Sequence, residues 1–360
     1  MRVQAVLSKV IQVLDTDAQS PFRARILKAD DRRTDLRCIS LTSVFRAMER
    51  SGFFIAKTKK GQVVEYGPLW AVDNVATMKR TVAFLTGYFD FIRTEVTDLW
   101  EKGAAEGGGL AMNDGVTVCI NTLHSILHHL QTVKRVPLTD LSNEEMVKTI
   151  EPYARLVGRY FASMPPGKVA DFRALRGVQG QTTGTRGVEE AIRQSDPSFD
   201  PPGLREFLER EKAQTTTRAF EVIQRVERIL QSTILAEVKS EFGQSEQDWW
   251  FNGVPKGVRK KVDDRINEEG GKKGGREENF DLIDYRDIVQ ANWPLFEETL
   301  GKGKGSKDNR TKWIVEVNEL RKSVMHASKG VSLPITEEQL TFLEEVETWL
   351  RGQVEAEAAE

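Results

Sequence analysis

The sequence predicts a mostly α protein whose C-terminal part is a helical bundle. Three observations support this. Apolar residues recur at helical spacing along most of the 360 residues, capping boxes precede two of the apolar runs, and one segment alone alternates like a β-hairpin. The apolar fraction of 39% suffices to bury a sizeable core, and the chain is long enough for two domains.

Composition and charge exclude several functional classes. The net charge of −2 creates no global field for nucleic acid or anionic membranes, so any anion binding has to be local. No apolar run approaches the roughly 20 residues that a membrane span needs, and residues 1–17 read as an amphipathic helix rather than a signal peptide. Cys38 and Cys119 lie in apolar contexts without metal-ligand spacing, which favours buried free thiols and a cytoplasmic location.

The N-terminal part, residues 1–135, is expected to be mainly helical. A hairpin is predicted at 53–67, with its turn at Lys60-Gly61, and a long helix at about 73–100. A glycine-rich loop at 101–115 then precedes a helix that carries His124, His128 and His129.

Residues 136–212 are expected to form a helix followed by a linker. Ser142 and Glu145 make a capping box that begins the helix. The stretch 164–203 is dense in proline and glycine, which favours a flexible connector. Its "GVQGQTTGTRG" segment lacks the Gly-Lys-Ser/Thr ending of a phosphate-binding P-loop.

Residues 213–351 are predicted to form the helical bundle. Its longest helix carries a mostly apolar stripe, formed by Phe220, Ile223, Val226 or Glu227, Leu230 and Ile234. The acids of "FDLIDYRDI" are expected to cap a further helix. A second capping box, Thr336 with Gln339, begins the last helix, which should end near Leu350 and leave 352–360 as a disordered tail.

His124 and His128 stand one helical turn apart, a spacing that can chelate a metal. Ser125 occupies the place where a zinc-protease motif needs its glutamate, and no third ligand is evident. A metal site is therefore the minor alternative, and we expect neither a metal nor another cofactor.

The loop "GKGKGSKDNRTK" is a stronger candidate for binding phosphate. Its cations and glycine amides can approach a phosphate closely, and it leads into the helix of "NELRKSVMHAS". We expect Lys302, Lys304, Lys307 and Arg310 to contact RNA, while a solvated surface loop remains the alternative.

Arg321 and His326 are the candidate catalytic residues. They differ by about 140° in azimuth on an ideal helix, whereas Glu319, Lys322 and His326 share a face. One chain therefore does not bring the pair together easily. The two side chains could meet at a frayed helix end or across a two-fold axis between two chains.

An Arg-x4-His motif on a late helix, preceded by "WIVEVNEL" and followed by a loop and a final helix, resembles HEPN domains. The segments "DWWFNGVPKGVRKKV", "IVQANWPLFEETL" and "NELRKSVMHAS" are most similar to the subgroup of transcript-surveillance endoribonucleases and bacterial conflict-system proteins. The resemblance covers about residues 213–351. It implies a dimeric, metal-independent endoribonuclease in which both chains line a shared cleft.

The resemblance also implies a role for each residue. Arg321 would stabilise the phosphorane charge and His326 would act as general acid or base, because RNA cleavage needs a proton taken from the 2′-OH and one given to the 5′-oxygen. Asn318, Glu319 and Lys322 would be auxiliary. Lys322 departs from the Asn, Asp or His that active members usually carry after the arginine.

Residues 1–135, together with "FRALRG", more weakly resemble the later portion of DGQHR-domain (DndB-like) proteins, which are linked to DNA phosphorothioation and phage defence. The Asp-Gly-Gln-His-Arg string itself is absent. This resemblance implies a role in bacterial defence, with a separate DGQHR-type or other defence protein as a partner. The HEPN resemblance implies RNA and a second copy of the chain as the other partners. The alternative is a non-catalytic HEPN module that dimerises or binds nucleotides or nucleic acid.

Overall fold

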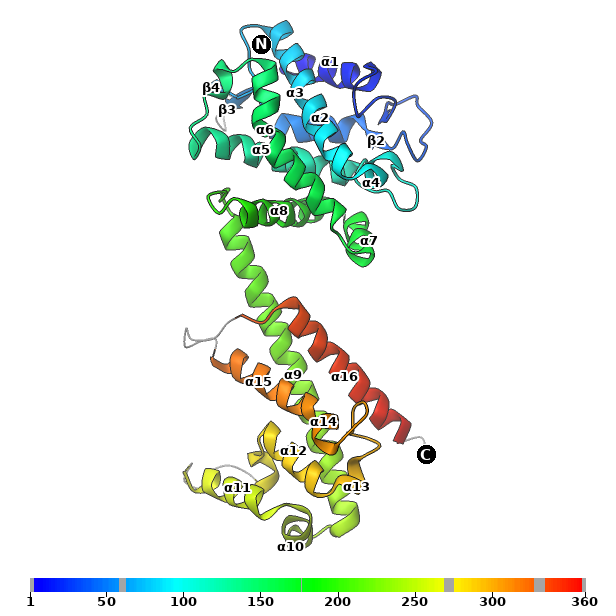
Figure 1. Cartoon of the computed structure of the whole chain (residues 1–360), viewed down its shortest axis with the longest axis vertical. Helices are drawn as coiled ribbons and strands as arrows, with labels where there is room; N and C mark the ends of the chain where they lie inside the picture. Colours follow the sequence, from blue (N-terminus) through cyan, green and yellow to red (C-terminus); the bar gives the residue numbers. More distant parts are fainter. Residues whose placement is uncertain (1–2, 58–62, 176, 269–274, 327–333, 358–360) are drawn as a thin grey trace. The chain divides into compact units, whose positions relative to one another are not determined.

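A computed structural model describes the chain except for residues 1–2, 58–62, 176, 269–274, 327–333 and 358–360 (Figure 1). The fold is mostly α with small β elements, as the sequence predicts. The chain divides into two compact units, Met1–Phe207 and Leu208–Glu360, and each has its own hydrophobic core.

Unit 1 is built from eight described helices and two small sheets. The helices are α1 (Val3–Thr16), α2 (Leu41–Arg50), α3 (Asn74–Glu95), α4 (Thr97–Glu101), α5 (Asn113–Thr132), α6 (Asn143–Ala162), α7 (Pro166–Ala174) and α8 (Gly177–Ser195), with a 3₁₀ turn η1 (Leu138–Asp140) before α6. Strands β1 (Ile26–Leu27) and β2 (Ile39–Ser40) pair in parallel, and β3 (Ile55–Lys57) and β4 (Val63–Tyr66) pair antiparallel. The predicted hairpin is therefore present, while its turn residues Lys60 and Gly61 lie outside the described part.

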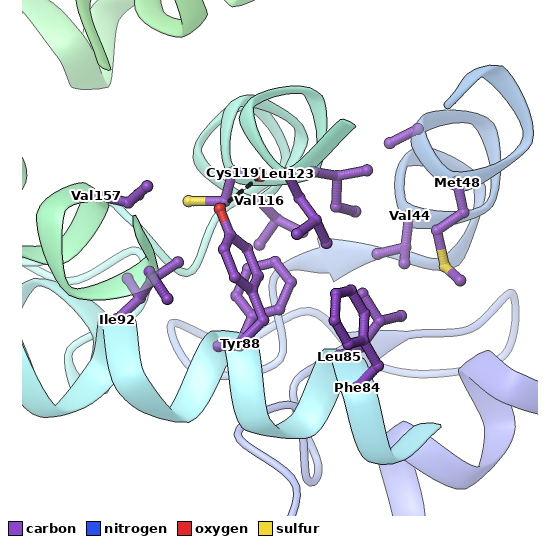
Figure 2. Close-up of a cluster of buried hydrophobic side chains, with 14 of the residues drawn as sticks. Val44, Met48, Phe84, Leu85, Tyr88, Ile92, Val116, Cys119, Leu123 and Val157 are labelled. Carbon is purple, nitrogen blue, oxygen red and sulfur yellow. Dashed lines mark hydrogen bonds between the residues drawn. The ribbon is translucent and has the colours of Figure 1, made fainter. Parts of the chain in front are cut away.

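The core of unit 1 forms around α3, which packs against α1 and α6. Figure 2 shows α3 side chains pointing toward α5 and α2, with Tyr88 reaching the backbone of Cys119. The Tyr88 hydroxyl donates a 2.9 Å hydrogen bond to the Cys119 carbonyl oxygen, so this buried polar atom is satisfied. Cys38 and Cys119 are buried free thiols, as expected.

The predicted linker at 164–203 is wrong, because most of it is helical. Helices α7 and α8 occupy this region, and α8 packs against α5 and α6. Two glycines of α8 lie where other side chains leave no room: a Cβ at Gly184 would lie 2.9 Å from Val118 Cγ2, and one at Gly187 would lie 2.5 Å from the Tyr160 hydroxyl. These two glycines therefore allow close helix packing. The boundary between the two units falls at 207/208, close to position 213, where the sequence places the start of the bundle.

Unit 2 is a helical bundle with a core of its own. Helix α9 (Leu204–Phe242) begins in unit 1 and supplies the longest helix of unit 2. It is followed by α10 (Glu246–Asp248), the π-helical turn η2 (Trp249–Gly253), α11 (Lys256–Glu268), η3 (Arg276–Asn279), α12 (Leu282–Ala291), α13 (Trp293–Phe296), α14 (Lys307–Arg310), α15 (Lys312–His326) and α16 (Glu337–Glu357).

The apolar stripe of α9 faces this core as predicted, except that Phe220 does not belong to it. Val226 and Leu230 are fully buried, Glu227 lies at the edge of the stripe, and Phe220 is exposed. Helices α9 and α16 lie side by side (Figure 1), and Arg225 Nε on α9 lies 2.8 Å from Glu347 Oε1 on α16.

Both predicted capping boxes are confirmed. The Glu145 amide donates to the Ser142 hydroxyl at 3.2 Å, and the Ser142 amide donates to the Glu145 carboxylate at 2.8 Å. Thr336 and Gln339 exchange the equivalent bonds at the start of α16. That helix continues past Leu350 to Glu357, so much of the expected tail is helical. No helix in the described part of the chain combines the length and the apolar character needed to cross a membrane.

Candidate functional site

Arg321 lies between two carboxylates contributed by other helices. Its Nε is 3.7 Å from Oε2 of Glu227 on α9, and one terminal nitrogen is 3.7 Å from Oδ1 of Asp281, the N-cap of α12. Both distances exceed hydrogen-bond length. Among the described residues Arg321 makes no hydrogen bond, although its side chain is only 24% exposed. Its charge is therefore balanced by two carboxylates at ion-pair distance, without a direct hydrogen bond to either.

The environment of Glu227 is unusual for a carboxylate. Burial raises the pKa of Glu227, and the charge of Asp281 adds to that effect while Arg321 opposes it. Tyr285, next to this group, is 2% exposed, and its pKa is raised chiefly by burial. In the sequence, Glu227 appeared only as an alternative to Val226 in the apolar stripe of the longest helix. A charged residue within that stripe was the one sign that Glu227 belongs to a site.

A second arginine, Arg265 on α11, anchors the N-terminus of α12. It reaches Asp281 at 2.9 Å and the fully buried Asp284 at 2.5 Å. The Asp281 amide also donates to the Asp284 carboxylate at 3.0 Å, which confirms the expected capping role of these acids. Asp281 is thus held in place by bonds of its own, and it offers Arg321 a fixed negative charge.

His326 is the last residue of α15, and its side chain lies outside the described part of the chain. The helix is regular through this position, so the backbone positions of Arg321 and His326 differ by about 140° in azimuth. The described residues of one chain therefore leave Arg321 and His326 on different sides of the helix axis.

The auxiliary residues do not gather around Arg321. Lys322 and Glu319 form an exposed pair with a distance of 2.8 Å between Nζ and Oε1. Asn318 is buried within the bundle at 5% exposure. Lys322 is thus engaged with a neighbour on its own helix rather than with the carboxylates that flank Arg321.

The basic loop is largely folded onto unit 2. Arg310 lies 2.6 Å from Glu297 Oε1 and donates to the carbonyl oxygens of Glu297 and Gly301. Lys302 Nζ lies 5.5 Å from the ring centre of Trp349, and Lys307 Nζ donates to the Gln290 carbonyl oxygen at 3.2 Å.

Lys304 is exposed, and it is the loop lysine best placed for solvent and ligands. The loop meets the N-terminal end of α15, whereas Arg321 lies about 14 Å further along the helix. Arg310 therefore has a structural role, and the other cations do not lie beside Arg321.

A cationic and aromatic cavity of about 420 Å³ lies near the start of α11 and was missed in the sequence. Arg259 lies over the ring of Phe251 at 4.9 Å, and Arg276 lies over the ring of Trp250 at 4.8 Å. Phe251 is 54% exposed and belongs to the π-helical turn η2, a type of turn frequent at functional sites. The remaining lining residues are Lys256, Lys260, Asp263 and Asp264.

Packed aromatic rings lie between this cavity and Tyr285, the residue beside Glu227. Trp250 contacts Phe280, and Phe280 contacts Tyr285, with ring centres 6.0 Å and 5.7 Å apart. The aromatic-to-basic order of "DWWFNGVPKGVRKKV" was the sequence signal for this surface.

His124 and His128 line a cavity in unit 1 together with Arg50 and Arg186. Within the described residues no group of three or more His, Cys, Asp or Glu is arranged to hold a metal ion. The two guanidinium groups also oppose binding of a metal cation there.

The chain was compared with family models, with curated proteins and with solved structures, and it matches none of them.

Proposed function

We propose that unit 2 is a metal-independent endoribonuclease that acts as a homodimer. The observation that carries the proposal is the environment of Arg321. Its guanidinium is largely buried, lies 3.7 Å from Glu227 and from Asp281, and makes no hydrogen bond among the described residues. Arg321 also belongs to the same helix as His326, which is the last residue of α15. Such a group can bind the phosphate of an RNA strand and stabilise the charge of a phosphorane.

The chemistry needs one acid–base group besides the arginine. The ribose 2′-oxygen attacks the neighbouring phosphorus as its proton is removed, and the P–O5′ bond breaks as the leaving oxygen gains a proton. His326 is proposed for these transfers. Because positions 321 and 326 lie about 140° apart on α15, a second copy is proposed to supply the complementary residue across a two-fold axis.

The cavity formed by Phe251 and Arg259 supports an RNA substrate. Exposed aromatic rings bind unstacked bases, and cations beside them bind the backbone. Unit 1 is proposed to sense a trigger or bind a partner protein in a defence system, in line with its resemblance to DGQHR-domain proteins.

The second candidate is a non-catalytic HEPN module that binds nucleic acid or nucleotides. This candidate is favoured by the lysine that directly follows Arg321. Lys322 forms an ion pair with Glu319 and replaces the Asn, Asp or His usual in active HEPN domains. In this case Arg321 would bind phosphate without cleavage.

The deciding experiment is incubation of the full chain with labelled RNA in EDTA. Wild type is compared with Arg321→Ala, His326→Ala and the matched control Arg228→Ala, which removes an exposed arginine from α9. We expect products with 2′,3′-cyclic phosphate ends, rates reduced about 10²- to 10⁴-fold in the first two variants, and an unchanged rate in the control. A wild type that binds RNA but never cuts it would support the second candidate.

A further inference from the structure

Two helices of unit 1 face each other with polar side chains at matching positions. On α5 these are Asn121, His124, Ser125 and His128, and on α8 they are Thr182, Thr185, Arg186 and Glu189. Both sets follow the spacing i, i+3, i+4, i+7, which places them on one face of each helix. Ser125, Thr185 and Glu189 of these sets are buried, whereas His124, His128 and Thr182 are exposed, so the two polar faces meet at the surface of unit 1.

The two polar faces line a cavity of about 300 Å³ that opens to the surface. Arg50 and Ser51, at the C-terminal end of α2, and Pro202 complete the lining. All these residues belong to unit 1. The volume matches the lower end of the range typical of small-molecule sites.

One wall of the cavity is a fixed ion pair. Glu189 is 1% exposed, accepts a hydrogen bond from Ser125 at 2.5 Å, and lies 2.6 Å from a terminal nitrogen of Arg186. Burial raises the pKa of the Glu189 carboxyl, and Ser125 and Arg186 oppose that effect. Arg186 also donates to the Pro202 carbonyl oxygen at 2.9 Å, so its guanidinium is oriented before any ligand arrives.

Arg50 supplies a second cation to the cavity. It is exposed, and within the described residues no carboxylate lies at ion-pair distance from it. Because Glu189 balances Arg186, the charge of Arg50 leaves the cavity with an excess of one positive charge. His124 adds a hydrogen-bonding group, with a pKa lowered mainly by burial. The lining thus combines guanidinium, imidazole, amide and hydroxyl groups, which suits an anion that also carries hydroxyl groups.

We propose that this cavity binds a small phosphate-bearing molecule of nucleotide size, with the phosphate between Arg50 and Arg186. Guanidinium groups match the geometry of phosphate oxygens. Asn121 and Thr182 would then contact the sugar or base. This site lies within unit 1, and it does not depend on RNA cleavage by unit 2.

The test is calorimetric titration of the full chain with adenosine 5′-monophosphate, inorganic phosphate, succinate and adenosine. We expect the monophosphate to bind most tightly, inorganic phosphate to bind more weakly, and succinate and adenosine to show no binding. Arg50→Gln should weaken monophosphate binding about ten- to a hundredfold, as loss of one charge-assisted contact predicts.

Arg46→Gln is the matched control, because Arg46 is an exposed arginine one turn earlier on α2 and does not line the cavity. Its affinity should equal that of wild type. Thr182→Val, at an exposed position, is a second variant. It should weaken binding of the monophosphate and leave the affinity for inorganic phosphate unchanged. The proposal is overturned by absence of binding for both phosphates, by equal or tighter binding of succinate, or by equal loss in the Arg50 and Arg46 variants.

Discussion

Glu227 Oε2 on α9 lies 3.7 Å from Nε of Arg321 on α15, which joins the longest helix of unit 2 to the helix of the proposed site. Burial raises the pKa of Glu227. A raised carboxyl pKa contributes stability that is complete below the unfolded pKa of about 4.3. That contribution is lost as the pH rises through the folded pKa.

Glu227→Gln should therefore gain stability relative to wild type as the pH rises from about 4 to 7. Urea unfolding at both pH values measures the difference in the free energy of unfolding. Glu221→Gln, on the exposed side of the same helix, controls for loss of a carboxylate. A wild type that gains stability over Glu227→Gln across this range would contradict the assignment of burial as the dominant cause.

The contribution of Asp196 in unit 1 to stability should depend on pH in the opposite direction. Burial raises the pKa of its carboxyl, but donors from Ser198, Lys134 and Tyr153 outweigh that effect and hold the pKa well below its usual range. The Tyr153 hydroxyl and Lys134 Nζ lie 2.9 Å and 3.0 Å from Oδ2.

Asp196→Asn should cost about 1–3 kcal/mol at pH 7. The contribution of Asp196 is present above its unfolded pKa of about 3.9 and is lost as the pH falls through the folded pKa. Asp200→Asn, which removes an exposed partner of Arg205, should cost about 0–1 kcal/mol. Equal costs in the two variants, measured by urea unfolding at pH 7, would show that the bonds from Tyr153, Lys134 and Ser198 to Asp196 do not stabilise unit 1.

The basic loop yields a prediction that separates stability from binding. Arg310→Gln should destabilise unit 2 by about 1.5–3 kcal/mol, because it removes bonds to Glu297 and Gly301. Lys304→Gln should change stability by less than about 0.5 kcal/mol. Thermal unfolding of both variants checks this, and a neutral Arg310→Gln would show that the loop is not held by its arginine.

RNA binding should depend on the aromatic cavity beside α11. Phe251→Ala should weaken binding of single-stranded RNA by about 1–3 kcal/mol, as loss of one stacking contact predicts. Arg259→Gln should lower the slope of affinity against salt concentration. The triple replacement of Lys302, Lys304 and Lys307 by glutamine should do the same if the basic loop also contacts phosphates.

Fluorescence anisotropy at several salt concentrations distinguishes the two surfaces. Arg228→Gln, which removes an exposed arginine elsewhere in unit 2, is the control. If only the loop variant alters binding, the RNA follows the loop and the aromatic cavity has another role.

Local signals in the sequence were sufficient to predict where helices α6 and α16 begin. The capping boxes at Ser142 and Thr336 depend on residues three positions apart, and both are present. The apolar stripe of α9 was also predictable, because Ile223, Val226 and Leu230 repeat at helical spacing.

Features that depend on distant parts of the chain were not predictable. Glycine lowers helix propensity, so the sequence around Gly184 predicts a connector rather than a helix. Only the folded structure shows that Val118 on another helix leaves no room for a Cβ at this position. The carboxylates beside Arg321 come from α9 and from the start of α12, which only the tertiary fold brings together. No local pattern encodes that meeting.

The glycine content of α8 also determines how easily this helix opens. Each interior glycine costs about 1 kcal/mol of helix propensity relative to alanine, so α8 is helical because it packs against α5 and α6 rather than by its own preference. Local opening should therefore require less free energy in α8 than in α3, whose amides should exchange with solvent more slowly. Since α8 carries Arg186 and Glu189, an occupied cavity would slow amide exchange along α8 and leave α3 unchanged.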